Sequence, residues 1–319
     1  MNILVVFTGG TIGSSLKEGS LSPDLNSQFE LINHYEKSIS DHHAFHTISP
    51  LNILSENLQP SHWTTLIDAI EEQELQKFDG IILTHGTDTL SFTANALALY
   101  FTKLSIPLLL VSSYAPLNVS QTNGHDNFKA AIDFIAEKVT GVFVSYKNPG
   151  EEHVSIFHAH QITQSPQLSS RFESLHYLTA SVESDGVKIL NPVPKEVELG
   201  KRARPLFDEE ILYIKPYPAL DYDSFNLSKH KIIVHDLYHS GTCDINKLKP
   251  FARHCKRENI LLFLAPIPKD DHYYETTQEL IDMGIYFLYD LSIEHVLTKV
   301  MFASKNFPDT VDLLDYLFK

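Results

Sequence analysis

Two short segments rich in hydroxyl groups and glycine directly follow apolar runs that are typical of buried strands. The first, TGGTIG at residues 8–13, follows Ile3–Phe7, and the second, THGTDT at residues 84–89, follows Gly80–Leu83. Ligands bind beyond the carboxyl ends of strands in parallel sheets, so both segments are candidates for a functional site. Threonine hydroxyls are potential nucleophiles, glycine lets the backbone approach a ligand closely, and a carboxylate can hold an ammonium group.

Each segment also has a purely structural interpretation. TGGTIG is typical of a tight turn, and Asp88 is typical of a helix cap because it precedes the apolar window Thr89–Phe101. The first segment does not match the dinucleotide-binding pattern G-x-G-x-x-G, and no helix pattern follows it directly. Glycine, serine and proline at residues 19–23 instead predict a mobile loop.

The two segments in this order resemble the signatures of the bacterial L-asparaginase and glutaminase amidohydrolases of the cytoplasmic type. The similarity continues through Leu51–Asn57, Ser112–Leu117 and Asp290–Met301, and so covers essentially the whole chain. It implies an active site in the larger of two α/β domains. It also implies a homodimer or a dimer of dimers, in which the partner's C-terminal domain completes the site, with no metal and no organic cofactor. The implied reaction converts L-asparagine to L-aspartate and ammonia, and L-glutamine is the other candidate substrate.

The resemblance gives a role to each matching residue. Thr11 is the implied nucleophile on the side-chain carboxamide, and Thr87 is an alternative nucleophile or a hydroxyl that activates water. Asp88 is implied to bind the α-ammonium group and Ser55 the α-carboxylate. The backbone amides of Gly10 and Thr87 are the implied oxyanion donors. The other implied substrate-binding residues are Gly86, Ala115 and Glu56, the last at a position where relatives carry glutamine or aspartate.

Two groups that assist catalysis in the family are missing. In the loop after the expected strand Val142–Tyr146, the lysine position is occupied by Gln164 or, in another alignment, by Thr163. No tyrosine stands between residues 13 and 29, where Leu21 is nearest in register to the family's tyrosine. Glutamine neither accepts a proton as lysine does nor carries a charge. The loss of a positioned base costs about 10²–10⁴-fold in rate.

Two classes of function therefore compete: a working asparaginase, and an impaired or re-specialised asparaginase-like protein that binds a small amino acid or amide. A working enzyme without the lysine needs another base, and the candidates are His158, His160 and Lys147. The alternative is that both histidines are exposed strand residues. With His153 they could also bind zinc, but the spacing offers no suitable third ligand, so we expect no metal. Glu275 is a candidate for a position next to the substrate.

The elements that must position these residues follow from the hydrophobic pattern. Apolar runs alternate with helical windows, which predicts the α/β class, with a mostly parallel sheet flanked by helices. The expected strands are Ile3–Phe7, Phe45–Ile48, Gly80–Leu83, Leu108–Val111, Val142–Tyr146, Ile211–Lys215, Ile232–His235, Ile260–Leu264 and Ile285–Leu288. The expected helices are Pro60–Gln76, Thr89–Phe101, Gly124–Glu137, Ile245–Lys256, Tyr274–Met283, Ile293–Phe302 and Val311–Leu317.

A stretch rich in proline and charge divides this alternation. Residues 191–210 have no apolar period and predict a linker. We therefore expect an N-terminal α/β domain of residues 1–190 that carries the active site, and a smaller C-terminal α/β domain of residues 211–319.

Composition narrows the class of protein. The chain has 319 residues, and 43% of them are hydrophobic, which excludes a disordered chain. Its formal charge of −15 argues against binding to nucleic acid. No apolar stretch reaches the roughly 20 residues that span a membrane, and the N-terminus lacks the basic region of a secretory signal. Cys243 and Cys255 are too few for a disulfide framework. We therefore expect a cytoplasmic protein with reduced thiols that binds neither nucleic acid nor membranes.

Overall fold

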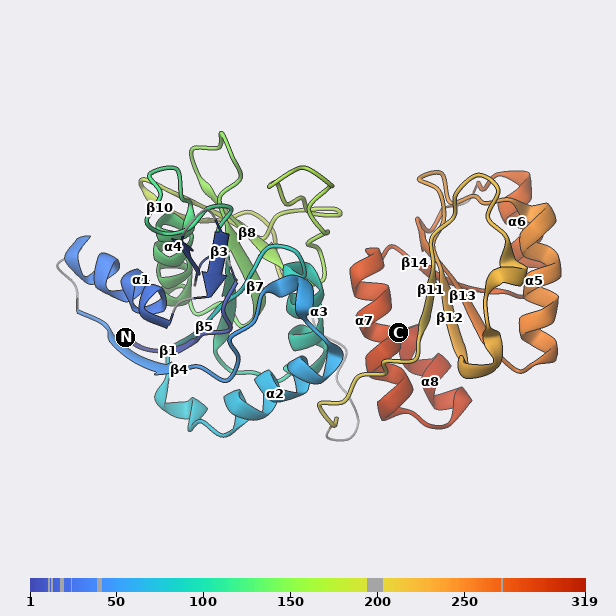
Figure 1. Cartoon of the computed structure of the whole chain (residues 1–319), viewed down its shortest axis with the longest axis horizontal. Helices are drawn as coiled ribbons and strands as arrows, with labels where there is room; N and C mark the ends of the chain where they lie inside the picture. Colours follow the sequence, from blue (N-terminus) through green and yellow to red (C-terminus); the bar gives the residue numbers. More distant parts are fainter. Residues whose placement is uncertain are drawn as a thin grey trace. The chain divides into compact units, whose positions relative to one another are not determined.

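The computed structural model describes residues 1–10, 12, 14–17, 20–23, 25–38, 42–193, 203–270 and 272–319. The chain divides into two compact units, Met1–Pro205 and Leu206–Lys319, each with its own hydrophobic core (Figure 1). Residues 194–202 of the predicted linker lie outside the described residues. The predicted domain limits 1–190, 191–210 and 211–319 therefore stay a prediction.

In the described part of the first unit, eight strands form one mixed sheet in the order β10-β9-β8-β7-β6-β5-β1-β4. Neighbouring strands pair in parallel among β4, β1, β5, β6 and β7, whereas β8, β9 and β10 join antiparallel. This confirms the predicted α/β class with a mostly parallel sheet. The strands are β1 (Asn2–Val6), β4 (Ala44–Ile48), β5 (Gly80–Thr84), β6 (Pro107–Val111), β7 (Gly141–Tyr146), β8 (Val154–His158), β9 (Ala180–Glu183) and β10 (Gly186–Ile189).

Helices flank this sheet, and their burial explains its apolar strands. Strands β5 and β6 are buried along their whole length, because both faces of a central parallel strand are covered. α1 packs against α4, and α2 packs against α3 (Figure 1). α3 is buried on nearly every side, as expected of a helix that is apolar all round. The helices are α1 (Leu25–Ser38), α2 (Pro60–Glu71), α3 (Leu90–Tyr100) and α4 (Gly124–Ala136).

The predicted loop after the TGGTIG segment contains regular structure instead. Strands β2 (Ser14–Lys17) and β3 (Ser20–Pro23) form an antiparallel hairpin, and α1 follows it. The hairpin strands have only four residues each and are rich in serine and turn-forming residues, so their composition is that of a loop. A search for apolar or alternating runs in the sequence therefore does not detect these strands.

The second unit is built on an all-parallel sheet in the order β11-β12-β13-β14. Helix α5 packs against α6, and α7 packs against α8. Its elements are β11 (Leu212–Ile214), β12 (Ile232–His235), α5 (Ile245–Arg257), β13 (Leu261–Ile267), α6 (Glu275–Asp282), β14 (Tyr286–Tyr289), α7 (Ile293–Asn306) and α8 (Thr310–Leu317). Among the described residues of the whole chain, no helix combines the length and the apolar character that crossing a membrane requires.

Candidate functional site

The two glycine-rich segments meet where β1 and β5 end. Gly10 has a φ of +76°, and a Cβ atom there would lie 2.4 Å from the backbone nitrogen of Gly86. Gly9 has a φ of +96°, and a Cβ atom there would lie 2.5 Å from the carbonyl oxygen of Ile53. Only glycine fits such contacts, because a side chain would clash with backbone that has no room to move. Three chain segments therefore touch through their peptide groups at this edge of the sheet.

Ser55 joins the third segment to this edge. It begins the short 3₁₀ helix Ser55–Asn57, and its side chain is buried. Its Oγ accepts a hydrogen bond of 3.3 Å from the backbone N–H of Asp88 and lies 3.5 Å from Asp88 Oδ2. The Thr89 hydroxyl donates to the carbonyl of Ser55 over 2.9 Å. A serine hydroxyl and a carboxylate thus lie side by side, an arrangement suited to the two charged ends of an amino acid.

The other predicted site residues lie around this pair. Thr87 is half-buried, Asp88 and Glu56 are exposed, and Ala115 is half-buried on the loop after β6. Thr11 lies outside the described residues. The interpretation of Asp88 as a helix cap is wrong, because α3 has Thr89 at its N-cap and no side chain hydrogen-bonded there.

A buried histidine holds the turn between β5 and Thr87. His85 Nδ1 lies 2.7 Å from the carbonyl oxygen of Gly86, and His85 Nε2 lies 2.9 Å from the Thr93 hydroxyl, which accepts from Trp63 Nε1 at 3.0 Å. A carbonyl only accepts, so Nδ1 carries the proton and Nε2 accepts from Thr93. Burial lowers the pKa of His85 to about 4, which keeps the ring neutral near pH 7. The sequence alone gave this histidine no role, because its burial and partners depend on residues distant from it in the chain, such as Trp63.

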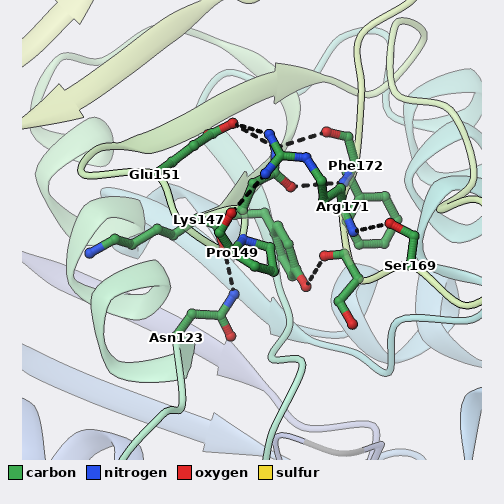
Figure 2. Close-up of polar contacts among 10 residues, drawn as sticks. Asn123, Lys147, Pro149, Glu151, Ser169, Arg171 and Phe172 are labelled. Carbon is green, nitrogen blue, oxygen red and sulfur yellow. Dashed lines mark hydrogen bonds and ion pairs between the residues drawn. The ribbon is translucent and has the colours of Figure 1, made fainter.

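The loop that carries Ala115 is tied to the end of β7. The Thr122 hydroxyl donates to the Ala115 carbonyl over 3.0 Å, and Ser113 also donates to that carbonyl. Asn123 accepts from the backbone of Tyr114 at 3.1 Å and donates from Nδ2 to the carbonyl of Lys147 at 2.8 Å (Figure 2). The loop is therefore fixed by hydrogen bonds at both ends.

The segment without the family lysine also reaches the site. Gln164 Nε2 donates to the carbonyl oxygen of Asp88 over 3.3 Å. The interpretation of His158 and His160 as exposed strand residues is wrong. His158 is fully buried in β8, and His160 is half-buried with Nδ1 3.0 Å from Asn95 Oδ1. Strand β8 lies between β7 and β9 and contacts helix α4, and all of its residues are buried.

The two remaining candidates, Lys147 and Glu275, belong to different units. Lys147 forms an ion pair of 2.9 Å with Asp126 on α4, and its side chain points away from Arg171 (Figure 2). Glu275 is the first residue of α6 and is exposed. Within the described ranges, no three histidine, cysteine, aspartate or glutamate side chains are grouped so that they could hold a metal ion.

A sequence model of the asparaginase N-terminal domain matches residues 2–193, which is more than half of the chain. The chain belongs to the asparaginase family. The family resemblance seen in the sequence is thereby confirmed, and it includes the segments that build the cluster of Gly10, Ser55, Gly86 and Asp88.

Curated relatives of this asparaginase-family chain carry two different names. It is 25% identical to the L-asparaginase of Thermococcus kodakarensis over 315 residues, which cover 95% of this chain and 92% of that protein. It is 29% identical to a subunit of the glutamyl-tRNA(Gln) amidotransferase of Methanococcus maripaludis over 236 residues, which cover 69% of this chain. The match spans 54%, about half, of the length of that relative.

Solved structures show the same fold. The thermostable L-asparaginase of Thermococcus kodakarensis aligns with a TM-score of 0.81 at 23% identity, covering 100% of this chain and 97% of that one. L-asparaginase I of Vibrio cholerae aligns with a TM-score of 0.80 at 19% identity, covering 99% and 96%. The whole chain therefore has the architecture of an asparaginase.

Proposed function

We propose that the protein is an L-asparaginase-type amidohydrolase, which converts L-asparagine to L-aspartate and ammonia. The observation that carries this proposal is the contact between Ser55 and Asp88 beside the touching glycines Gly10 and Gly86. The Asp88 carboxylate would bind the α-ammonium group and the Ser55 hydroxyl the α-carboxylate. The side-chain carboxamide would then lie toward the segment that contains Gly10 and Thr11.

The proposed reaction proceeds through an ester. The Thr11 hydroxyl attacks the carbonyl carbon of the carboxamide, the C–N bond breaks, and ammonia leaves with the proton of the hydroxyl. Water then cleaves the ester and releases L-aspartate. Thr87 is the alternative nucleophile or activates this water, and the backbone amides of Gly10 and Thr87 stabilise the oxyanion. In this proposal Glu56, Gly86 and Ala115 line the substrate site.

A second candidate is a protein that binds an amino acid without turning it over. Among the residues that the structure describes, no hydrogen bond joins Thr87 to a lysine or histidine, and both residues aligned with the family lysine, Gln164 and Thr163, are neutral. This favours weak turnover, because a threonine hydroxyl at neutral pH needs activation by a base or a charged neighbour.

The cellular setting belongs to the same proposal. We propose a cytoplasmic location, since a probable cytoplasmic L-asparaginase of Campylobacter jejuni shares the fold with a TM-score of 0.76. We also propose a homodimer or a dimer of dimers that acts on a small molecule, as the family resemblance implies. The similarity to amidotransferase subunits supports a different protein partner as the alternative. Measurement of the mass in solution, alone and with candidate partners, distinguishes these assemblies.

Ammonia release by the purified protein tests the function. We expect release from L-asparagine, with L-glutamine as the comparison substrate, and loss of release in Thr11→Ala and Thr87→Ala. The exposed Thr65 on α2 provides the control, since Thr65→Ala should leave the rate unchanged. Binding of L-aspartate without ammonia release would establish the second candidate. Absence of both binding and release would refute the proposal.

A further inference from the structure

The segment of residues 160–172 connects the end of β8 to the candidate site. We propose that this segment is a frame fixed at both ends, and that Gln164 within it is a positioning residue. Its hydrogen bond to the Asp88 carbonyl holds the turn at Thr87-Asp88 and so sets the place of the Asp88 carboxylate that faces the ammonium group. This inference rests on the proposed function, because the ammonium group is that of the proposed ligand.

The first end of the frame is attached to α3. His160 Nδ1 lies 3.0 Å from Oδ1 of Asn95, which is fully buried on that helix. The amide group of Asn95 donates to the Ser91 carbonyl over 2.9 Å, so Oδ1 is the acceptor that faces His160. Because α3 begins two residues after Asp88, this contact fixes the frame to the helix that starts at the site.

The second end is attached to the chain that leaves β7. Arg171 donates to the Pro149 carbonyl over 2.7 Å and to Glu151 Oε1 over 2.6 Å (Figure 2). Next to it, Asn148 exchanges two hydrogen bonds with the backbone of Phe172, at 2.8 Å and 2.9 Å.

A further hydrogen bond of 2.9 Å runs from the Tyr146 hydroxyl to the Ser170 carbonyl. Bonds from one short stretch of β7 and its following loop thus fix three consecutive residues, Ser170, Arg171 and Phe172. The charge-assisted bond between Arg171 and Glu151 is of the stronger kind.

Gln164 lies in the middle of the frame. Its side chain contacts the site through the hydrogen bond to the Asp88 carbonyl. A glutamine amide donates without bringing a charge. The frame thus determines the place of this donor.

The test measures the Kd of L-aspartate and of succinate, which lacks the ammonium group. In Gln164→Met, which removes the donor at similar volume, we expect the Kd of L-aspartate to rise about three- to tenfold, as for one lost hydrogen bond. The Kd of succinate should not change, because the effect passes through Asp88 and its ammonium partner.

A matched control stands in the same frame. Gln167 is exposed, and within the described chain its side chain makes no hydrogen bond, so Gln167→Met should leave both Kd values unchanged. Arg171→Met should weaken L-aspartate in the parent and should have no further effect in Gln164→Met, because coupled residues are not additive. Equal weakening of both ligands, additive effects, or an unchanged Kd in Gln164→Met would overturn the proposal. Gln164 is exposed, so its variants retain the fold even where Arg171→Met does not.

The failure of the proposed function has a different signature. If the parent binds neither ligand, the proposed function fails, and hydrogen–deuterium exchange then tests the frame by itself. Faster exchange of residues 84–92 in Gln164→Met, with none in Gln167→Met, supports the positioning role. Unchanged exchange in both variants overturns it.

Discussion

Acid should destabilise the first unit because His85 is buried as a neutral imidazole. In the unfolded chain this histidine has a pKa of about 6.5, and in the folded chain burial lowers it to about 4. Between these values the unfolded state binds about one proton more than the folded state, so stability falls as the pH falls. The contribution is fully present above pH 6.5 and is lost as the pH approaches 4.

The size of the effect follows from the two pKa values. Between pH 7 and pH 4.5 the free energy of unfolding should decrease by about 2.5 kcal/mol through His85 alone. The protein has a single tryptophan, Trp63, which shares the hydroxyl of Thr93 with His85. Tryptophan fluorescence during denaturation in urea therefore reports on the unit that contains the titrating group.

The variant His85→Gln isolates this contribution. Glutamine stays neutral at every pH, so the variant should be less stable at pH 7 by about 1–3 kcal/mol, for the lost hydrogen bonds, but should lose about 2.5 kcal/mol less on acidification. His235→Gln provides the control, because His235 is also buried with a pKa of about 4 but belongs to the second unit. It should leave the transition seen by Trp63 unchanged. The reasoning is refuted if the parent and His85→Gln lose the same free energy between the two pH values.

Two further outcomes test the site. Asp88→Asn keeps the shape of the side chain and removes its charge, so L-aspartate should no longer raise the melting temperature, whereas a retained shift would show that Asp88 does not bind the ammonium group. Gly10→Ala should destabilise the protein more than Gly284→Ala, because both glycines have a positive φ but only Gly10 would press a Cβ atom against backbone. Thermal unfolding of the two variants measures the difference, and equal losses would contradict the close contact with Gly86.

The central strands could be predicted because their continuous apolar composition indicates burial. β5 and β6 are continuous apolar runs, and α3 follows with an apolar surface all round, so both the elements and their parallel pairing follow from local pattern. The burial of β8 escaped this reasoning because its sequence, VSIFH, contains a serine and a histidine. Burial of polar residues depends on neighbours distant in the sequence, such as Asn95 for His160.

The candidate site was predictable in its residues but not in its contacts. Because both motifs directly follow expected strands, Gly10, Gly86 and Asp88 were expected at one edge of the sheet. The hydrogen bond between Ser55 and Asp88, 33 residues apart, depends on how the loop after β4 folds back, which no local pattern encodes. The attachment of Gln164 to Asp88 is likewise set by two distant anchors, His160 and Arg171.

The change from parallel to antiparallel pairing at β7 determines which segment beside the site can be replaced without rebuilding the sheet. Parallel strands are joined by crossover helices that also form the core, so altering their connections rebuilds the domain. The connection between β8 and β9 has no such helix and is held by side-chain hydrogen bonds at its ends. A connection of another length or chemistry can therefore replace it while the sheet, the glycine contact and the pair Ser55–Asp88 stay in place. The segment that carries Gln164 can therefore vary independently of the pair Ser55–Asp88.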